Sequence, residues 1–246
     1  MKFDLHVHSC LSPCASLEMS PAAIVAAAKA AGMDGLALTD HQSAKNTPAI
    51  AECARRAGLA CLYGAEVQTA EEVHTLTLFD SLETARELTD WIYAALPRRK
   101  NDPDSFGDQP VVTWDEEIVE MEEKLLAAGC AHDIPTVADF VHERGGLYIA
   151  AHVDRPNFSV FGSLGEIPEP MDGGRYFDAV ELSRTADEAL WRGKIGDYAI
   201  IRSSDAHHLA DVSRVWTEAD GEFSIVGLKE IFDRRATRLS PRLTRF

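Results

Sequence analysis

The stretch Asp4-Leu5-His6-Val7-His8-Ser9 decides the fold, because it sets two histidines two residues apart directly after an apolar start. Side chains at alternate positions of a β-strand point to the same face, so both imidazoles can reach one ion. Neutral imidazole is the commonest metal ligand in proteins. The stretch therefore predicts a strand whose carboxyl end contributes a pair of metal ligands.

The same arrangement, an apolar run followed by polar groups, recurs along the chain. The later motifs are Thr39-Asp40-His41, Gly64-Ala65-Glu66 with His74 eight residues on, Ala150-Ala151-His152 and Ser203-Ser204-Asp205-Ala206-His207. The carboxyl ends of barrel strands form one face, so side chains that are distant in sequence would converge there. Imidazole and carboxylate together are typical metal ligands. The pattern predicts a multinuclear metal site at the mouth of a barrel.

Strand and helix signals alternate before residue 97 and favour a parallel sheet, most simply a barrel. Strands are expected at 3–7, 35–39, 60–63 and 73–79, with an amphipathic helix at 81–96. Two earlier helices open at Ser20-Pro21 and Thr47-Pro48 and stop at Gly32 and Gly58, the usual order of capping residue, first-turn proline and final glycine.

Residues 97–133 interrupt this rhythm with a polar, turn-rich segment and an acidic run, 116–128, that we expect to be helical. The alternation then resumes with a helix at 135–144, strands at 147–151, 177–182 and 198–203, and a last helix at 224–235. We expect one domain over residues 1–246 with an insertion at about 97–133, which would serve as a lid, an interface or a specificity loop.

Composition limits the partners. The 246 residues include 24 Lys and Arg against 40 Asp and Glu, a formal net charge of −16. Lys and Arg must neutralise phosphates wherever a protein follows a nucleic-acid backbone, so we expect no duplex nucleic acid among the partners. Divalent ions would still make one pocket locally positive and able to receive a small anionic substrate.

The chain also carries signals of its compartment. It contains no apolar run of about 18 residues or more, and no basic segment followed by an apolar one near residue 1, so we expect neither a membrane span nor a secretory signal. Five cysteines are an odd number without a disulfide-like framework. These features favour the reducing cytoplasm.

Taken together, the motifs resemble those of the polymerase and histidinol phosphatase (PHP) superfamily of metal-dependent phosphoesterases. The matching pieces are His6-Val7-His8-Ser9, Thr39-Asp40-His41, Gly64-Ala65-Glu66 with His74, Ala151-His152 and Ser204-Asp205-Ala206-His207. Each piece alone is weak, but all five in the family's order cover nearly the whole chain and are highly specific. The resemblance implies an α/β fold, a distorted (β/α)7 barrel that holds up to three divalent metals.

The resemblance also implies how the metals are held. The ligands of one ion would be His6, His8, Glu66 and Asp205. Glu66 would bridge to a second ion held by His74 and His152. The ligands of a third ion would be His41, His207 and one residue after the first motif.

That last ligand departs from the family pattern. Members often carry Asp or His five or six residues after the second histidine of the first motif, where this chain has Pro13 and Cys14. A Cys14 thiolate would favour zinc or iron over manganese. Alternatively, the third site would be weak or empty. Two or three divalent ions, zinc, manganese or iron, are therefore expected.

These residue types suit phosphoester hydrolysis. A bridging carboxylate such as Glu66 holds two cations close together, and a water between them loses a proton near neutral pH. We expect the resulting hydroxide to attack a phosphate ester in line, with Asp205 or a metal-bound water managing protons. Asp40 would lie close as support for the ligands or as a base. Glu181, beside a strand end, would line the pocket or serve a structural role.

A substrate phosphate needs cations besides the metals. Arg155 follows the Ala151-His152 motif, and Arg184 comes just past the strand that ends at Leu182, so both are expected to project from the active face. Arginine is suited to bidentate phosphate contacts. We predict both as substrate anchors, with Lys45 as a third candidate.

The leading interpretation is a metal-dependent phosphoesterase that acts on a small phosphorylated molecule, either a phosphomonoester or a nucleotide-like compound. One alternative is hydrolysis of a non-phosphate bond, because related metal barrels cleave amides; the arginine pair argues against it. Another is a non-catalytic, metal-binding regulatory module, which would have no reason to keep a near-complete ligand set. The substrate, the metal and the oligomeric state are not determined by the sequence.

Overall fold

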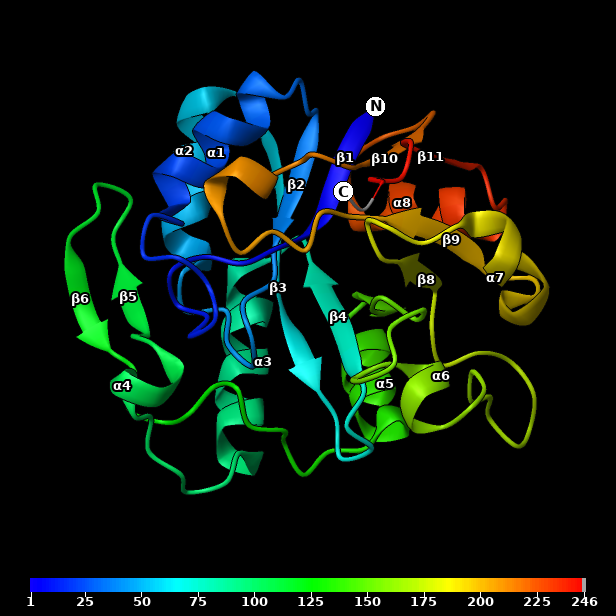
Figure 1. Cartoon of the computed structure of the whole chain (residues 1–246), viewed down its shortest axis with the longest axis horizontal. Coiled ribbons are helices and arrows are strands. Elements are labelled where there is room, and N and C mark those ends of the chain that lie inside the picture. Colours follow the sequence, from blue (N-terminus) through cyan, green and yellow to red (C-terminus); the bar gives the residue numbers. More distant parts are fainter. Residues whose placement is uncertain (245–246) are drawn as a thin grey trace.

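Among residues 1–244, nine strands form a sheet that curves around the centre of the molecule (Figure 1). The computed structural model describes residues 1–244. The strand order is β11 (Thr237–Leu239), β10 (Thr217–Ala219), β1 (Lys2–Val7), β2 (Gly35–Leu38), β3 (Ala60–Gln68), β4 (His74–Phe79), β7 (Leu147–Ala150), β8 (Ala179–Leu182) and β9 (Ala199–Arg202). Strands β1 to β3 are parallel, as are β7 to β9, and β4 lies antiparallel between these two groups.

The sheet nearly closes on itself beyond the carboxyl end of β9. The backbone N–H of Asp205 donates to the carbonyl of His6 at 2.9 Å, and that of His8 donates to the carbonyl of Ala206 at 3.1 Å. The hydroxyl of Thr237, on β11, donates to the carbonyl of Ile200, on β9, at 2.8 Å. The expected α/β distorted barrel is therefore confirmed, and a few specific bonds between its two edges close it.

The helices begin and end where the sequence supplies caps. Ser20 caps α1 (Pro21–Ala30) by accepting from Ala23 N at 3.2 Å, and α2 (Thr47–Ala57) ends at Gly58, whose φ of 61° suits glycine. Apart from the four-residue α4 (Pro103–Phe106), the remaining helices among residues 1–244 are α3 (Leu82–Ala95), α5 (Ile134–Glu143), α6 (Val160–Ser163), α7 (Glu188–Ile195) and α8 (Ile225–Asp233), with a 3-10 turn η1 (Leu209–Asp211). Each of these five helices carries a Ser or Asp N-cap whose side chain accepts a hydrogen bond from the first turn.

Apolar side chains bury both faces of the sheet. Ile149 of β7 lies with Leu5, Leu76 and residues of α8 in one cluster, whereas its neighbours Tyr148 and Ala150 lie with α3 and α5 in another. Strands that are buried on both faces read as continuous apolar runs, which explains their strong signal in the sequence. Each buried Leu or Ile stabilises the fold by about 1.5–3 kcal/mol. The polar residues at the strand ends therefore stand on a well-packed frame.

Residues 97–133 form α4 (Pro103–Phe106) and a separate two-stranded sheet of β5 (Pro110–Val112) and β6 (Ile118–Met121), which lies beside α2 and α3 in Figure 1. Asn46 holds β5, because its Oδ1 accepts from Val112 N at 2.9 Å and its Nδ2 donates to the carbonyl of Pro110 at 3.3 Å. We propose that these residues are an insertion docked on a single domain.

Two expectations about local structure are wrong. Residues 116–128 are not a helix, because Glu116 takes a left-handed backbone (φ 70°) and the β-branched pair Ile118 and Val119 lies in strand β6. The strand at 74–79 is not parallel, because only five residues separate Gln68 from His74. A connection that short makes a hairpin and cannot hold a crossover helix.

Within residues 1–244, none of the helices has both the length and the apolar character needed to cross a membrane. All five cysteines, which fall in this range, are free thiols.

Candidate metal centre

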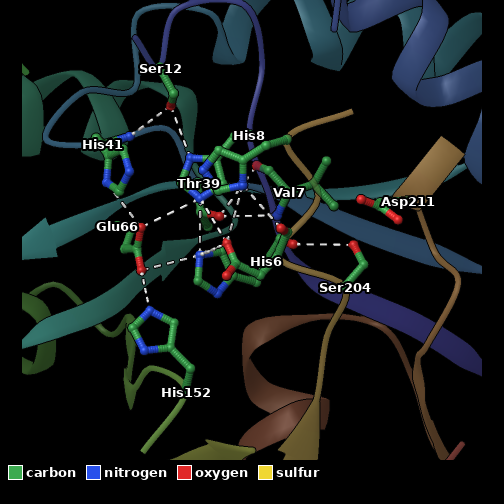
Figure 2. Close-up of polar contacts among 12 residues, drawn as sticks. His6, Val7, His8, Ser12, Thr39, His41, Glu66, His152, Ser204 and Asp211 are labelled. Carbon is green, nitrogen blue, oxygen red and sulfur yellow. Dashed lines mark hydrogen bonds and ion pairs between the residues drawn. The ribbon is translucent and has the colours of Figure 1, made fainter. Parts of the chain in front are cut away.

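Imidazole and carboxylate side chains from both halves of the sheet meet at the mouth of the barrel (Figure 2). They come from the ends of β1, β2, β7 and β9, from β3, and from the first residue of β4. Because β4 runs antiparallel, its first residue lies at the same edge as the carboxyl ends of the parallel strands, and His74 pairs with Gln68 near the end of β3. The side chains are His6, His8, His41, Glu66, His74, His152, Asp205 and His207.

Four of these side chains form a buried group. The Nε2 atoms of His6 and His8 lie 3.1 Å apart, and Asp205 Oδ1 lies 3.4 Å from each of them. Glu66 places Oε1 3.3 Å from His6 Nε2 and Oε2 3.4 Å from His8 Nε2. Tetrahedral ligands that are about 2.0–2.2 Å from a zinc ion lie about 3.3–3.6 Å from one another. The spacing and the chemistry of these donors thus fit a divalent cation.

Glu66 connects this group to three more histidines. Its Oε1 lies 2.9 Å from His74 Nδ1 and 3.1 Å from His152 Nε2, while its Oε2 lies 3.0 Å from His41 Nδ1. Both carboxylate oxygens therefore face imidazoles from different strands. This is the position that a bridging ligand between two ions requires.

A third group brings His41 and His207 together with His8 and Cys14. Cys14 is an exposed residue; partial desolvation of its thiol opposes ionisation, but hydrogen bonds with His207 and His41 lower its pKa to about 6. The side chain that departs from the family pattern therefore lies beside the two histidines and is disposed to form a thiolate, the form that binds metals.

The centre favours ionised carboxylates. Burial would raise the pKa of Glu66, yet the charges of His74, His6 and His41 hold it well below its usual range. Burial likewise opposes ionisation of Asp205, but His6, His8 and Arg155 keep its pKa low. Concentrated carboxylates and imidazoles in a buried site are costly unless they are paired or bind a cation. A divalent metal would satisfy them.

The ligands are oriented by groups behind them. Glu181 Oε2 lies 2.9 Å from His6 Nδ1 and accepts from the backbone N–H of His152 at 3.0 Å, which turns the Nε2 of His6 toward the other ligands. Glu181 Oε1 is buried and finds no hydrogen-bond partner among residues 1–244. Glu181 lies one residue before the end of β8, and its position near a strand end was the sequence signal for a role in the site.

Asp40 organises the loop after β1. Its Oδ1 accepts from Ser9 N and Ser12 Oγ, both at 2.7 Å, and its Oδ2 accepts from Ser9 Oγ at 2.6 Å. Ser12 Oγ also lies 2.9 Å from His8 Nδ1 and 3.1 Å from the backbone N–H of His41. Ser9 and Ser12 were missed by the sequence reasoning, because short hydroxyl side chains near a ligand motif carry no distinctive signal.

Two of the candidate ligands occupy unusual backbone conformations. His152 has a φ of 29° and Asp205 a φ of 50°, in the left-handed region that non-glycine residues rarely adopt. His152 is the second residue after β7 and Asp205 the third after β9, and each is held by a backbone hydrogen bond, from His152 N to Glu181 and from Asp205 N to His6. Such strain is maintained where the surroundings fix a functional geometry.

The three predicted anchors lie in different places. Arg155 donates to Asp205 Oδ2 at the centre itself. Arg184 pairs with Asp211 at 2.9 Å, in a hollow next to the one that Arg155 lines. Lys45 is paired with Glu122 and, at 2.6 Å, with Glu120, so its ammonium group joins the barrel to β6 of the insertion.

A distorted barrel whose carboxyl edge gathers these imidazoles and carboxylates defines a class of protein, the α/β barrels with a candidate metal centre at the carboxyl ends of their strands. The sequence model of the PHP domain matches residues 4–189, well over half of the chain. The protein therefore belongs to the PHP domain family, as its motifs indicated.

Three relatives are informative. Uncharacterized protein YqxK of Bacillus subtilis (strain 168) is 34% identical over 85 residues, which are 32% of this chain and 21% of that protein. The lesion-specific endonuclease PfuEndoQ of Pyrococcus furiosus has the same fold, with a TM-score of 0.67 at 18% identity over 97% of this chain. A protein of Bifidobacterium adolescentis assigned as a metal-dependent phosphoesterase gives a TM-score of 0.57 at 21% identity, over 83% of this chain and 87% of that one. This chain spans only 57% of the PfuEndoQ chain.

The expectation that duplex nucleic acid is excluded is wrong. Endonuclease Q, which has this fold with a TM-score of 0.62 at 17% identity over 93% of this chain and 55% of its own, was solved in complex with a 27-mer duplex substrate. Net charge is a property of the whole surface, whereas phosphate contacts depend on the cations around one site. The acidic balance of this chain therefore does not exclude a duplex.

Proposed function

We propose that this protein hydrolyses a phosphoester bond in a small phosphorylated substrate, either a phosphomonoester or a nucleotide-like compound. The observation that carries this proposal is the contact between Arg155 and Asp205. This contact places a guanidinium, the group best suited to bind phosphate, next to a carboxylate of the metal centre.

The residues that would hold two or three divalent ions are those of the three groups above, with Cys14 in the third. When bound, such cations (zinc, manganese or iron) acidify water and neutralise charge on a phosphoryl group. The surrounding protein positions the side chains that would hold these ions. Glu66 stays ionised between two sets of imidazoles, and Glu181 keeps the Nδ1 of His6 engaged.

Proton transfer is assigned to Asp205. Its Oδ1 faces His6 and His8, whereas its Oδ2 accepts from Arg155, so Oδ2 becomes able to accept a proton once the guanidinium turns from it to a bound phosphate. Both oxygens of Asp40 are taken by Ser9 and Ser12, so of its two possible roles we assign it support of the ligand loop.

Space for the rest of the substrate adjoins Arg155. A hollow of about 530 Å³ is lined by this arginine, by Phe161 and Trp191, and by Lys194. Volumes of this size are typical of small-molecule sites. The two aromatic rings pack against each other with centroids 5.4 Å apart and give one wall an apolar face for an organic group.

The test measures metal content together with hydrolysis of p-nitrophenyl phosphate, bis-p-nitrophenyl phosphate, a duplex oligonucleotide and an amide, with and without chelator. We expect two or three ions per chain and chelator-sensitive turnover of a phosphoester. Glu66→Ala should lose both metal and turnover, whereas Glu188→Ala should retain them, because Glu188 is a partly exposed residue of α7 that pairs with Arg192. Full activity of Glu66→Ala, or a protein that stays metal-free after reconstitution, would contradict the proposal.

A second test addresses the substrate anchors. Arg155→Gln and Arg184→Gln should each raise KM for the preferred phosphoester, because each removes a charged hydrogen-bond donor. The effect on KM should exceed any effect on metal content. Unchanged kinetics in either variant would remove that arginine from the substrate site.

A further inference from the structure

A chain of hollows leads away from the metal centre along the ends of β7, β8 and β9. Arg155, which contacts Asp205, lines a hollow of about 280 Å³ together with Ser183 and Arg184. Arg184 and Thr185 also line the next hollow, of about 360 Å³. The two hollows adjoin one another, because they share Arg184 and Thr185, and the inner one adjoins the metal centre through Arg155.

The outer hollow, which we call the arginine pocket, is lined by Arg184, Thr185, Asp211, Arg214, Arg242, Leu243 and Thr244. Its three arginines come from three separate segments: the loop after β8, the loop after η1 and the segment after β11. The backbone N–H of Leu243 donates to the carbonyl of Arg184 at 2.8 Å, which fixes the last of these segments against the first.

Carboxylates hold the three guanidinium groups in place. Asp211 contacts Arg184 at 2.9 Å through Oδ2 and Arg214 at 3.3 Å through Oδ1. Asp187 contacts Arg242 at 3.1 Å. Each guanidinium has five N–H donors, more than one carboxylate oxygen accepts, so donors remain for an anion. The arginines are thus pre-arranged, which reduces the entropy lost when a ligand binds.

The net charge of this pocket is opposite in sign to that of the whole protein. The whole chain has a formal charge of −16, yet here three arginines face two carboxylates, and the hydroxyls of Thr185 and Thr244 add neutral donors. Several arginine N–H donors in a forked geometry match the oxygens of a phosphate better than they match an organic group without negative charge.

We propose that the arginine pocket binds a second phosphate of the substrate, while the first lies at the metal centre beside Arg155. This inference rests on the proposed function, and it narrows the substrate class to molecules that carry a phosphate group in addition to the one that reacts. Arg214 and Arg242 then contact substrate without touching the reacting atoms.

The test compares two substrates that differ only in that group: thymidine 5′-p-nitrophenyl phosphate with and without a 3′-phosphate. The measured quantity is the ratio of their KM values. We expect the wild-type protein to prefer the 3′-phosphorylated compound by roughly ten-fold or more, as for hydrogen bonds to charged groups. In Arg214→Gln and Arg242→Gln the ratio of the two KM values should fall to about one.

Arg238→Gln is the matched control. Arg238 lies on β11, four residues from Arg242, and its exposed guanidinium pairs with Asp220 at 3.1 Å, the same distance as in the Arg242–Asp187 pair. This variant loses the same charge outside the pocket and should keep the wild-type preference. A wild-type ratio near one, or a ratio in Arg214→Gln that equals the wild-type value, would overturn the subsite.

Binding separates this inference from the proposed function. If neither compound is hydrolysed, the proposed function fails, and the affinities of thymidine 3′,5′-bisphosphate and thymidine 5′-monophosphate, measured by calorimetry, give the same comparison without turnover. A preference for the bisphosphate that Arg214→Gln abolishes supports the subsite; equal affinities overturn it.

The second phosphate can belong to a small bisphosphate or to a nucleic-acid strand. Competition with oligothymidylates of two and ten nucleotides distinguishes these sources. If affinity rises with the length of the oligonucleotide, the second phosphate belongs to a strand. If affinity is independent of length, it belongs to a small molecule. Either result supports the subsite when Arg214→Gln lowers the affinity. If Arg214→Gln lowers the affinity for neither oligonucleotide, the result counts against the subsite.

Discussion

Glu66 and Glu181 illustrate how single residues acquire different roles in one site. Glu66 presents both oxygens to imidazoles, and the positive charges around it lower its pKa despite burial. Glu181, equally buried, faces the opposite ring nitrogen of His6. A carboxylate that accepts from Nδ1 fixes the tautomer and leaves Nε2 for a metal. We therefore treat Glu66 as a ligand and Glu181 as a positioning residue.

Glu181→Gln tests this distinction at the residue scale. The amide keeps the shape but not the charge, so we expect metal affinity to fall by about 10–100-fold, as for other outer contacts of metal ligands. Competition with a fluorescent chelator measures the affinity. Glu188→Gln, the same change at a partly exposed position of α7, is the control. Equal affinities of Glu181→Gln and the wild-type protein would refute the positioning role.

At the scale of elements, the insertion reaches the metal centre through its first turn. Gly107, which follows α4, has a φ of 99°, and a Cβ there would lie 2.2 Å from the carbonyl oxygen of Pro13. Pro13 directly precedes Cys14. The insertion therefore packs against the loop that carries the third-site thiol, and a glycine is required for this approach.

Gly107→Ala should displace that loop and lower the number of metals bound per chain, besides destabilising the fold by about 1–3 kcal/mol through backbone strain. Elemental analysis and urea unfolding provide the two measurements. Gly145→Ala is the control, because Gly145 has a φ of 73° and an added Cβ there meets nothing within 4 Å. If both variants retain the wild-type metal content, the insertion does not support the third site.

At the scale of the whole molecule, the metal centre also closes the barrel. The hydrogen bonds from Asp205 N to His6 O and from His8 N to Ala206 O join its two edges, and all of these residues except Ala206 are ones that we assign as ligands. Metal binding and closure of the barrel should therefore support each other, since ligands bound to one ion cannot separate.

Removal of metal should accordingly lower thermal stability. An ion present at about 100 times its Kd stabilises the folded state by about 2.7 kcal/mol, which corresponds to a Tm shift of about 5–10 °C for a chain of this size. Scanning calorimetry with chelator, and then with metal restored, measures the shift. Glu66→Ala should respond to neither treatment. An identical Tm with and without chelator in the wild-type protein would contradict the coupling.

The sequence by itself determined the α/β barrel and predicted the side chains that gather as candidate metal ligands, because buried strands read as apolar runs and each of these side chains lies at or near a strand end. His6, His8 and Asp205 needed only that rule. The tertiary structure alone decided the antiparallel direction of β4, the hairpin in the insertion and the pairing of Lys45 with Glu120 and Glu122. These depend on contacts between residues distant in sequence, whose energies leave no local periodicity. The arginine pocket belongs to the same category, because Arg184, Arg214 and Arg242 meet only when three separate segments pack together.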